Sequence, residues 1–220
     1  MDRINFEDLR TKYQDQRVVM VGTGSSISRT RAVAGFGLPI FTVDTALQDL
    51  SEMGLQAQLL WVQDGRLLVD KQHQIAPYLS PDMTLCVPNS VNLPVFQRSP
   101  NIVEYNALGT MGFSHDPRLG AFSGHSAIYG LFQLMSWIRP KHVALTGVDI
   151  DFAATKSWEF PQINDPDFGL PSNDSHISHV LKGLSILRSQ GIEVENYSDF
   201  ALLDESDAGG GRYAKRVVSG

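Results

Sequence analysis

The feature that most constrains the fold is a short apolar run that ends in a turn of glycine and serine near the start of the chain. Residues 18–21 read Val-Val-Met-Val, and residues 22–26 read Gly-Thr-Gly-Ser-Ser. A buried strand of a parallel sheet is a continuous apolar run of this kind. Glycines let the backbone approach a ligand, serines add hydroxyl donors, and a helix that follows points free N–H groups at an anion. The pattern predicts a nucleotide site whose candidate residues are Gly22, Gly24, Ser25 and Ser26.

This turn differs from two familiar nucleotide-binding motifs. It lacks the third glycine of the dinucleotide fingerprint at its usual place, and it lacks the lysine of a P-loop. The sequence therefore argues against an ordinary hydride-transfer enzyme and against a Walker-type ATPase. A plain tight turn without a ligand is the alternative interpretation.

Further apolar runs alternate with helical patterns along the chain. Strands are expected at residues 17–21, 39–43, 58–62, 83–87, 102–105, 142–148 and 192–196, and helices at residues 6–13, 28–34, 46–53, 126–138 and 176–189. This alternation implies right-handed crossovers and a parallel sheet. We predict an α/β fold with a Rossmann-like, mostly parallel sheet and helices on both faces. It would form a single domain over residues 1–205, with a lid-like loop near 152–172 and a flexible tail at 206–220.

Composition narrows the class of protein. The chain has 220 residues, with 18 Lys and Arg against 24 Asp and Glu, and one cysteine, Cys86. The acidic balance argues against a nucleic-acid partner, and a lone cysteine fits a reducing compartment and a place in the core. The N-terminus has no apolar signal-peptide core, and no run approaches the roughly 20 apolar residues of a membrane span. We expect a cytoplasmic protein; peripheral association with the inner membrane face and an oligomeric state stay open.

Carboxylates follow several of the predicted strands. Asp44 and Asp64 follow the second and third strands, and Asp149 follows the strand at residues 142–148. Ligands of parallel sheets lie beyond the carboxyl ends of the strands, where carboxylates bind ribose hydroxyls or hold Mg²⁺ through water. Helix capping is the alternative for both Asp44 and Asp64. Asp149 would position an acceptor hydroxyl or structure the lid.

Two further motifs open predicted helices. The run Ser123-Gly124-His125-Ser126 precedes the long apolar helix, and its small polar residues suit a phosphate or a base edge, with capping by Ser123 as the alternative. His176 opens the last helix, where the dipole disfavours the protonated imidazole and so favours a neutral general base. An exposed histidine in a helix capped by Asp174 is the alternative. His179 lies one turn on, without an evident third ligand for a metal pair. The remaining candidates, expected in loops or at strand edges without chemistry, are His73, His115 and His142.

The order of these motifs resembles a known superfamily. A Gly-x-Gly-x-Ser turn comes first, a Ser-Gly pair precedes a long apolar helix, a strand ends in Thr146-Gly147-Val148-Asp149, and Ser175-His176 opens a late helix. In this order the chain resembles the bacterial sialyltransferases of glycosyltransferase family 42. It is also similar to the lipopolysaccharide-core Kdo-transferase relatives and to the Rossmann-like proteins that contain the hydroxymethylpterin diphosphokinases. The resemblance spans residues 18–203.

The sialyltransferase resemblance implies an inverting glycosyltransferase. Such an enzyme moves an acidic sugar, sialic-acid-like or Kdo-like, from a CMP donor to a saccharide acceptor, which can be lipid-linked. The late histidine, here His176, would deprotonate the acceptor hydroxyl. No tightly bound metal or cofactor is implied, because the leaving CMP carries a single phosphate. The positions that match the family's nucleotide-binding motifs are Gly22, Gly24, Ser25, Ser123 and Gly124.

Departures from the sialyltransferase pattern define two alternatives. The first turn reads Gly-Thr-Gly-Ser-Ser where that family has Gly-Asn-Gly-Pro-Ser, and the second strand ends in Asp44 where it has asparagine. Asp44 and Asp64 look more like the diphosphokinase branch, which binds ATP with Mg²⁺. One alternative is therefore an ATP- and Mg²⁺-dependent pyrophosphokinase in which these carboxylates and Asp149 are metal or ribose ligands. The other is a nucleotide-binding module without catalysis.

Overall fold

The computed structural model of the chain describes residues 4–35, 37–63, 75–90, 101–149 and 173–199, without the side chains of residues 173–176. The predicted lid, the predicted tail, Asp64 and His73 lie outside this part. No helix within it has the length and apolar composition needed to cross a bilayer.

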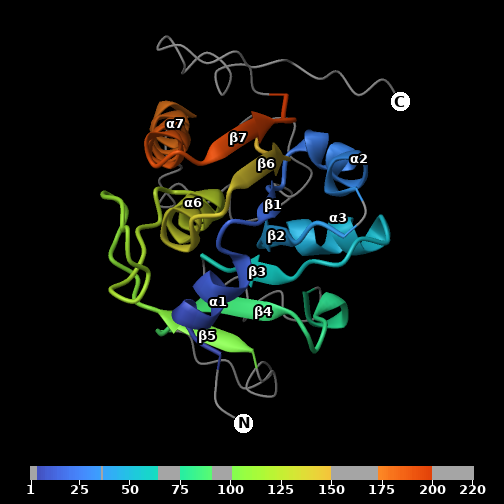
Figure 1. Cartoon of the computed structure of the whole chain (residues 1–220), viewed down its shortest axis with the longest axis horizontal. Coiled ribbons are helices and arrows are strands. Elements are labelled where there is room, and N and C mark those ends of the chain that lie inside the picture. The colour runs from blue at the N-terminus through green and yellow to red at the C-terminus, as the bar shows by residue number, and fades with distance from the viewer. Residues whose placement is uncertain (1–3, 36, 64–74, 91–100, 150–172, 200–220) are drawn as a thin grey trace, which may run out of the picture.

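The strands that the structure describes form one seven-stranded sheet (Figure 1). They are β1 (Arg17–Val21), β2 (Ile40–Val43), β3 (Leu59–Trp61), β4 (Thr84–Pro88), β5 (Ile102–Tyr105), β6 (His142–Thr146) and β7 (Glu193–Asn196). Their spatial order is β5-β4-β3-β2-β1-β6-β7, and every neighbouring pair is parallel. The predicted Rossmann-like α/β architecture is confirmed.

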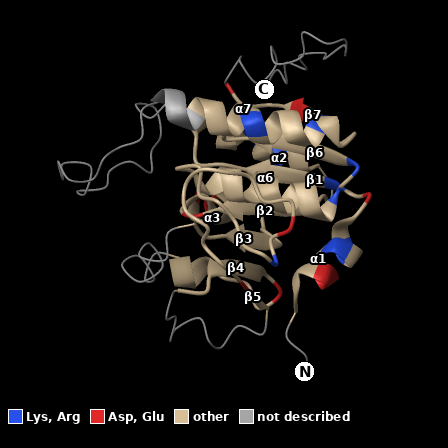
Figure 2. Cartoon of the chain, turned by 90° about the vertical axis from the view of Figure 1, so that its left-hand side faces the viewer, with Lys and Arg blue, Asp and Glu red and all other residues tan. Residues whose placement is uncertain are grey.

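Helices cover both faces of the sheet. One face carries α1 (Phe6–Tyr13), α6 (Ala127–Ile138) and α7 (Asn173–Ser189), and the other carries α2 (Thr30–Ala34) and α3 (Ala46–Glu52) (Figures 1 and 2). Successive side chains of a strand point to opposite faces. Accordingly Val18 and Met20 of β1 join the core under α1, α6 and α7, whereas Val19 and Val21 join the core under α2 and α3. A strand buried on both sides is a nearly continuous apolar run, which is why these strands can be recognised in the sequence.

Two helix starts differ from the sequence-based prediction. The helix expected at residues 28–34 begins as a 3₁₀ helix, η1 (Ser25–Arg29), and continues as α2. The last helix begins at Asn173, so His176 lies within its first turn and not at its first position. An acidic residue in a first turn complements the helix dipole, so the Asn-Asp-Ser run that looked like a cap continues the helix.

Helix α6 lies closer to the sheet than most side chains would permit. It is buried on almost every side, and a Cβ added at Gly130 would collide with Nε1 of the Trp61 indole on β3. Trp61 is itself fully buried and stacks on Tyr105 of β5, with ring centroids 4.3 Å apart. The absent side chain at Gly130 therefore makes room for the largest buried ring of the core.

We expect Gly130→Ala to destabilise the protein by about 1–2 kcal/mol, because overpacking of the Trp61 indole outweighs the better helix propensity of alanine. Urea denaturation measures the change in the free energy of unfolding. In a Trp61→Phe background, which removes the clashing part of the ring, the same substitution should cost less. A stabilising effect of Gly130→Ala in the native background would contradict this packing argument.

Candidate functional site

The candidate site is the carboxyl edge of the sheet beside β1 and β6. From β1 the chain moves outward through β2 to β5 and then returns to the opposite side of β1 as β6, so the strand order reverses between β1 and β6 (Figure 1). In open parallel sheets, ligands bind outside the carboxyl ends of the strands at such a reversal. The turns that follow β1 and β6 are the two segments that the sequence motifs single out.

The glycines of the first turn, residues 22–26, are explained by contacts within the chain. A Cβ at Gly22 would collide with the carbonyl oxygen of Gly147, and one at Gly24 would lie 2.5 Å from Oδ2 of Asp149. The Gly22 N–H donates to the Thr146 carbonyl oxygen at 2.9 Å, and the Gly24 N–H donates to the Gly147 carbonyl oxygen at 2.8 Å. These glycines let the turns after β1 and β6 pack against each other. The close approach that the sequence suggested for a ligand is made by the chain's own backbone.

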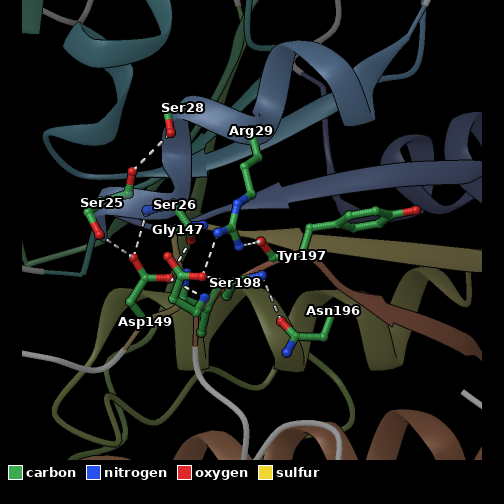
Figure 3. Close-up of polar contacts among 11 residues, drawn as sticks. Ser25, Ser26, Ser28, Arg29, Gly147, Asp149, Asn196, Tyr197 and Ser198 are labelled. Atoms are coloured by element: carbon green, nitrogen blue, oxygen red, sulfur yellow. Dashed lines mark hydrogen bonds and ion pairs between the residues drawn. The ribbon is translucent and has the colours of Figure 1, made fainter. Parts of the chain in front are cut away.

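Asp149 is the centre of the polar contacts at this edge (Figure 3). Its carboxylate is only 6% exposed, and it accepts hydrogen bonds from the Ser26 N–H at 2.7 Å, from the Ser26 hydroxyl and from the Ser25 hydroxyl at 3.2 Å. It also accepts the N–H of Asp199, which follows β7, at 2.9 Å. The Ser26 hydroxyl in turn accepts the Gly147 N–H at 2.9 Å. We call these five residues the Asp149 network; it joins the segments that follow β1, β6 and β7.

In the Asp149 network, a carboxylate of the chain itself binds an N–H group that was predicted to bind a phosphate. A ligand anion at a helix N-terminus would take the first free N–H groups, but here the Ser26 N–H at the start of η1 already binds a carboxylate. Asp149 is thus an internal anion in the place predicted for a phosphate. In this structure Asp149 holds three turns together; the acceptor-positioning role that the sequence suggested for it stays a prediction.

Residues 123–126 make a tight turn into α6. Gly124 and His125 both have left-handed φ values, 50° and 61°, and a Cβ at Gly124 would collide with the Tyr129 ring. The N–H groups of Ser123 and Gly124 donate to the carbonyl oxygens of Gly109 and Thr110. Ser123 does not cap α6, because the N-cap is Ser126, and no side chain provides a capping bond.

The long connection between β5 and α6, residues 106–126, crosses in front of α6 (Figure 2) and is fixed there by a buried glutamine. Gln133 Oε1 accepts the N–H groups of Ser114 at 2.9 Å and Phe122 at 3.0 Å. Its Nε2 donates to the carbonyl oxygens of Phe122 at 2.8 Å and Tyr129 at 3.1 Å. This amide sets the position of residues 123–126 from the middle of α6.

An aromatic and histidine cluster lies where α6 and α7 begin. The His179 ring is buried and meets the Tyr129 ring edge to face at a centroid distance of 5.1 Å, and the His125 ring lies 6.0 Å away. Burial raises the pKa of Tyr129 to about 12, so its hydroxyl stays protonated and donates to the Gly112 carbonyl oxygen at 2.7 Å. The sequence suggested His179 only as a metal-pair partner for His176, and nothing in the sequence motifs singled out Tyr129.

Helices α6 and α7 run in the same direction, which fixes the position of His176. Tyr129 contacts His179 near the starts of the two helices, and Ser136 accepts a hydrogen bond from Gln190 near their ends. The end of α6 leads into the start of β6, so both helices begin at the carboxyl edge. His176 lies one turn before His179, at this edge.

Asp44 follows β2 at the same edge, with a left-handed φ of 39° and a partly buried side chain. The N-cap position of α3 is Thr45, one residue after Asp44. Of the predicted site residues, the structure joins Gly22, Gly24, Ser25, Ser26 and Asp149; it places Asp44, Ser123 and Gly124 in other turns of the same edge; Asp64 and the side chain of His176 lie outside the described part.

Two residues that the sequence analysis considered, Cys86 and His142, lie away from this edge. Cys86 is fully buried in β4, as expected for a core residue, and burial raises the pKa of its thiol. His142 was expected at a strand edge but is buried at the start of β6, with Nε2 3.2 Å from Glu195 Oε2. Burial lowers the pKa of His142, and Glu195 opposes that shift.

The fold defines the chain as a Rossmann-like α/β protein with its polar turns gathered at one edge of the sheet. No protein-family model matches the sequence, and no curated protein matches it.

Proposed function

We propose that the protein is an inverting glycosyltransferase that moves an acidic sugar, sialic-acid-like or Kdo-like, from a CMP donor to a saccharide acceptor. The observation that carries this proposal is the gathering of the first turn, residues 123–126 and the first turn of α7 at one edge of a parallel sheet. These are three of the four segments on which the sialyltransferase resemblance depends; the fourth, Thr146-Gly147-Val148-Asp149, begins at the end of β6, at the same edge. The first turn and residues 123–126 are more than 90 positions apart in the sequence, so their proximity is not a local effect.

The donor nucleotide would lie across the carboxyl ends of β1 and β2. The Ser25 side chain is exposed there, and its hydroxyl oxygen can accept hydrogen bonds in addition to donating one to Asp149. Asp44, at the end of β2, is in the position where carboxylates of nucleotide-binding sheets accept ribose hydroxyls. Residues 123–126 would approach the base or the sugar from the start of α6.

His176 would be the general base. The dipole of α7 would favour a neutral imidazole in the first turn of the helix, and a neutral imidazole can accept a proton. The acceptor hydroxyl gives its proton to this imidazole while its oxygen bonds to the anomeric carbon of the donor sugar. The bond from that carbon to the phosphate oxygen breaks, and CMP leaves with the electron pair, which inverts the configuration in one displacement.

The state of Asp149 favours this proposal over an ATP–Mg²⁺ pyrophosphokinase that uses this carboxylate. Both of its oxygens accept hydrogen bonds from the chain, and the side chain is buried. A hydrated metal ion would have to displace several of these donors, each of which would then lose a charge-assisted bond.

A panel of nucleotides should separate the candidate functions. We expect CMP and CDP to stabilise the protein without added metal, because a ligand that binds only the folded state raises its unfolding free energy. At a 100-fold excess over Kd the gain is about 2.7 kcal/mol, or roughly 5–10 °C in Tm for a chain of this length. Differential scanning fluorimetry measures the shift, with UMP and cytidine as matched controls. Stabilisation by ATP that requires Mg²⁺ would instead support the pyrophosphokinase, and the absence of any nucleotide effect would contradict both enzymes.

A further inference from the structure

The carboxyl edge needs a cation if it is to hold an anionic donor. Three aspartates lie there, Asp44, Asp149 and Asp199, and the N–H groups of Gly22, Gly24 and Ser26 already have acceptors in the chain. A nucleotide phosphate therefore finds negative charge and few of the backbone donors that the first turn was expected to supply. Some other group must bind it.

In the described segments that follow the carboxyl ends of the strands, the Lys and Arg residues are Arg29 and Arg118. These segments are residues 22–29, 44–45, 62–63, 89–90, 106–126, 147–149 and 197–199. Arg118 forms ion pairs with Glu7 and Asp116 and lies over the Trp137 ring at 4.3 Å, near the far end of α6. The contacts of Arg118 therefore lie at the opposite end of the molecule from the carboxyl edge. Arg29 is the cation of the carboxyl edge in this part of the chain.

The Arg29 guanidinium contacts a backbone carbonyl oxygen at one side and a carboxylate at the other (Figure 3). Nη1 donates to the Tyr197 carbonyl oxygen at 2.8 Å, which anchors the side chain to the segment after β7. Nη2 lies 2.6 Å from Oδ1 of Asp199, and these two side chains are 43% and 55% exposed. An ion pair at this exposure contributes little to stability, so Asp199 is a counter-ion that another anion can replace.

We propose that Arg29 binds the phosphate of the nucleotide and that this phosphate displaces the Asp199 carboxylate. The identity of the nucleotide rests on the proposed function. A guanidinium presents a planar fork that matches two phosphate oxygens, and Arg29 is already oriented by Tyr197. The Asp199 backbone can stay where it is, because its N–H is held by Asp149, so only a side chain has to turn away. Arg29 also offsets the charge that develops on the phosphate oxygen as CMP leaves.

The test compares Arg29→Gln with Arg31→Gln by calorimetric titration of CMP, of cytidine and of inorganic phosphate. Arg31 is the matched control, because it lies two residues further on in α2 and donates to the Met53 carbonyl oxygen, away from the edge. We expect Arg29→Gln to weaken CMP about 10- to 100-fold and to leave cytidine unchanged. Arg31→Gln should bind CMP as the native protein does.

Asp199→Asn is a second variant that keeps Arg29 in place. Removing the competing carboxylate should strengthen CMP and phosphate binding by a few-fold, and unchanged or weaker binding would contradict the exchange. Native CMP affinity in a folded Arg29→Gln variant would overturn the role of Arg29 and leave the proposed function standing. If the native protein binds no CMP, the proposed function fails, and the titration of inorganic phosphate then tests the anion site by itself. Phosphate binding that is lost in Arg29→Gln supports an anion site at Arg29. Absence of phosphate binding by the native protein overturns that site.

Discussion

Replacing His176 with alanine should reduce sugar transfer by about 10²–10⁴-fold, the usual contribution of a general base, while CMP affinity changes by no more than a few-fold. The reason is that the imidazole would accept the acceptor's proton and take no part in holding the nucleotide. Steady-state rates with CMP-activated sialic acid or Kdo and a set of saccharide acceptors measure the first effect. Calorimetric titration of CMP measures the second.

His115→Gln is a suitable control for His176→Ala. His115 is exposed on the connection between β5 and α6, and its Nδ1 lies 3.0 Å from the Ser136 hydroxyl, toward the end of α6 that is remote from the carboxyl edge. Its substitution should leave turnover at the native level. Undiminished turnover in His176→Ala would refute the assignment of the base, and a parallel loss of CMP binding would indicate a structural role.

Replacing Asp149 with alanine should lower the free energy of unfolding by about 3–5 kcal/mol. The substitution leaves the Ser26 N–H, the Ser26 hydroxyl and the Asp199 N–H without their acceptor in a buried site. It also removes the contact that fills the space beside Gly24. Urea denaturation measures the loss, which corresponds to roughly 6–20 °C in Tm.

Asp149→Asn distinguishes the effect of the negative charge at position 149 on stability from the effect of the side chain's shape. The amide keeps the size of the side chain but presents a donor where the carboxylate accepted a bond, so we expect a smaller loss than for alanine. An Asp149→Ala variant as stable as the native protein would show that the network contributes nothing to the fold. If that variant also lost binding of ATP with Mg²⁺, the carboxylate would belong to a metal site and the pyrophosphokinase would replace the glycosyltransferase.

The architecture could be predicted because its determinants are local. Strands buried on both faces are uninterrupted apolar runs, and β1, β4 and β6 were recognisable from five or so consecutive residues. Alternation with helices then implies a parallel sheet, since a right-handed crossover is the normal way to join parallel strands. The burial of Cys86 was predictable for the same local reason.

The roles of the site residues were less predictable, because the residue type alone does not reveal what a glycine or an aspartate contacts in the folded protein. The sequence assigned Gly22 and Gly24 to a ligand, and the structure assigns their empty space to Gly147 and Asp149, more than 120 positions away. The sequence does not single out Arg29, because nothing local distinguishes it from Arg31. Its importance comes from Tyr197 and Asp199, which β7 brings beside it.

The sequence by itself determined that this chain forms a parallel α/β sheet with its polar turns at one edge, because hydrophobic periodicity and turn chemistry act within a few residues. Only the tertiary structure decided which of those polar groups are satisfied by the chain and which face outward. That distinction depends on contacts between segments that the strand order brings together, and a buried carboxylate with its donors already in place does different chemistry from an exposed one.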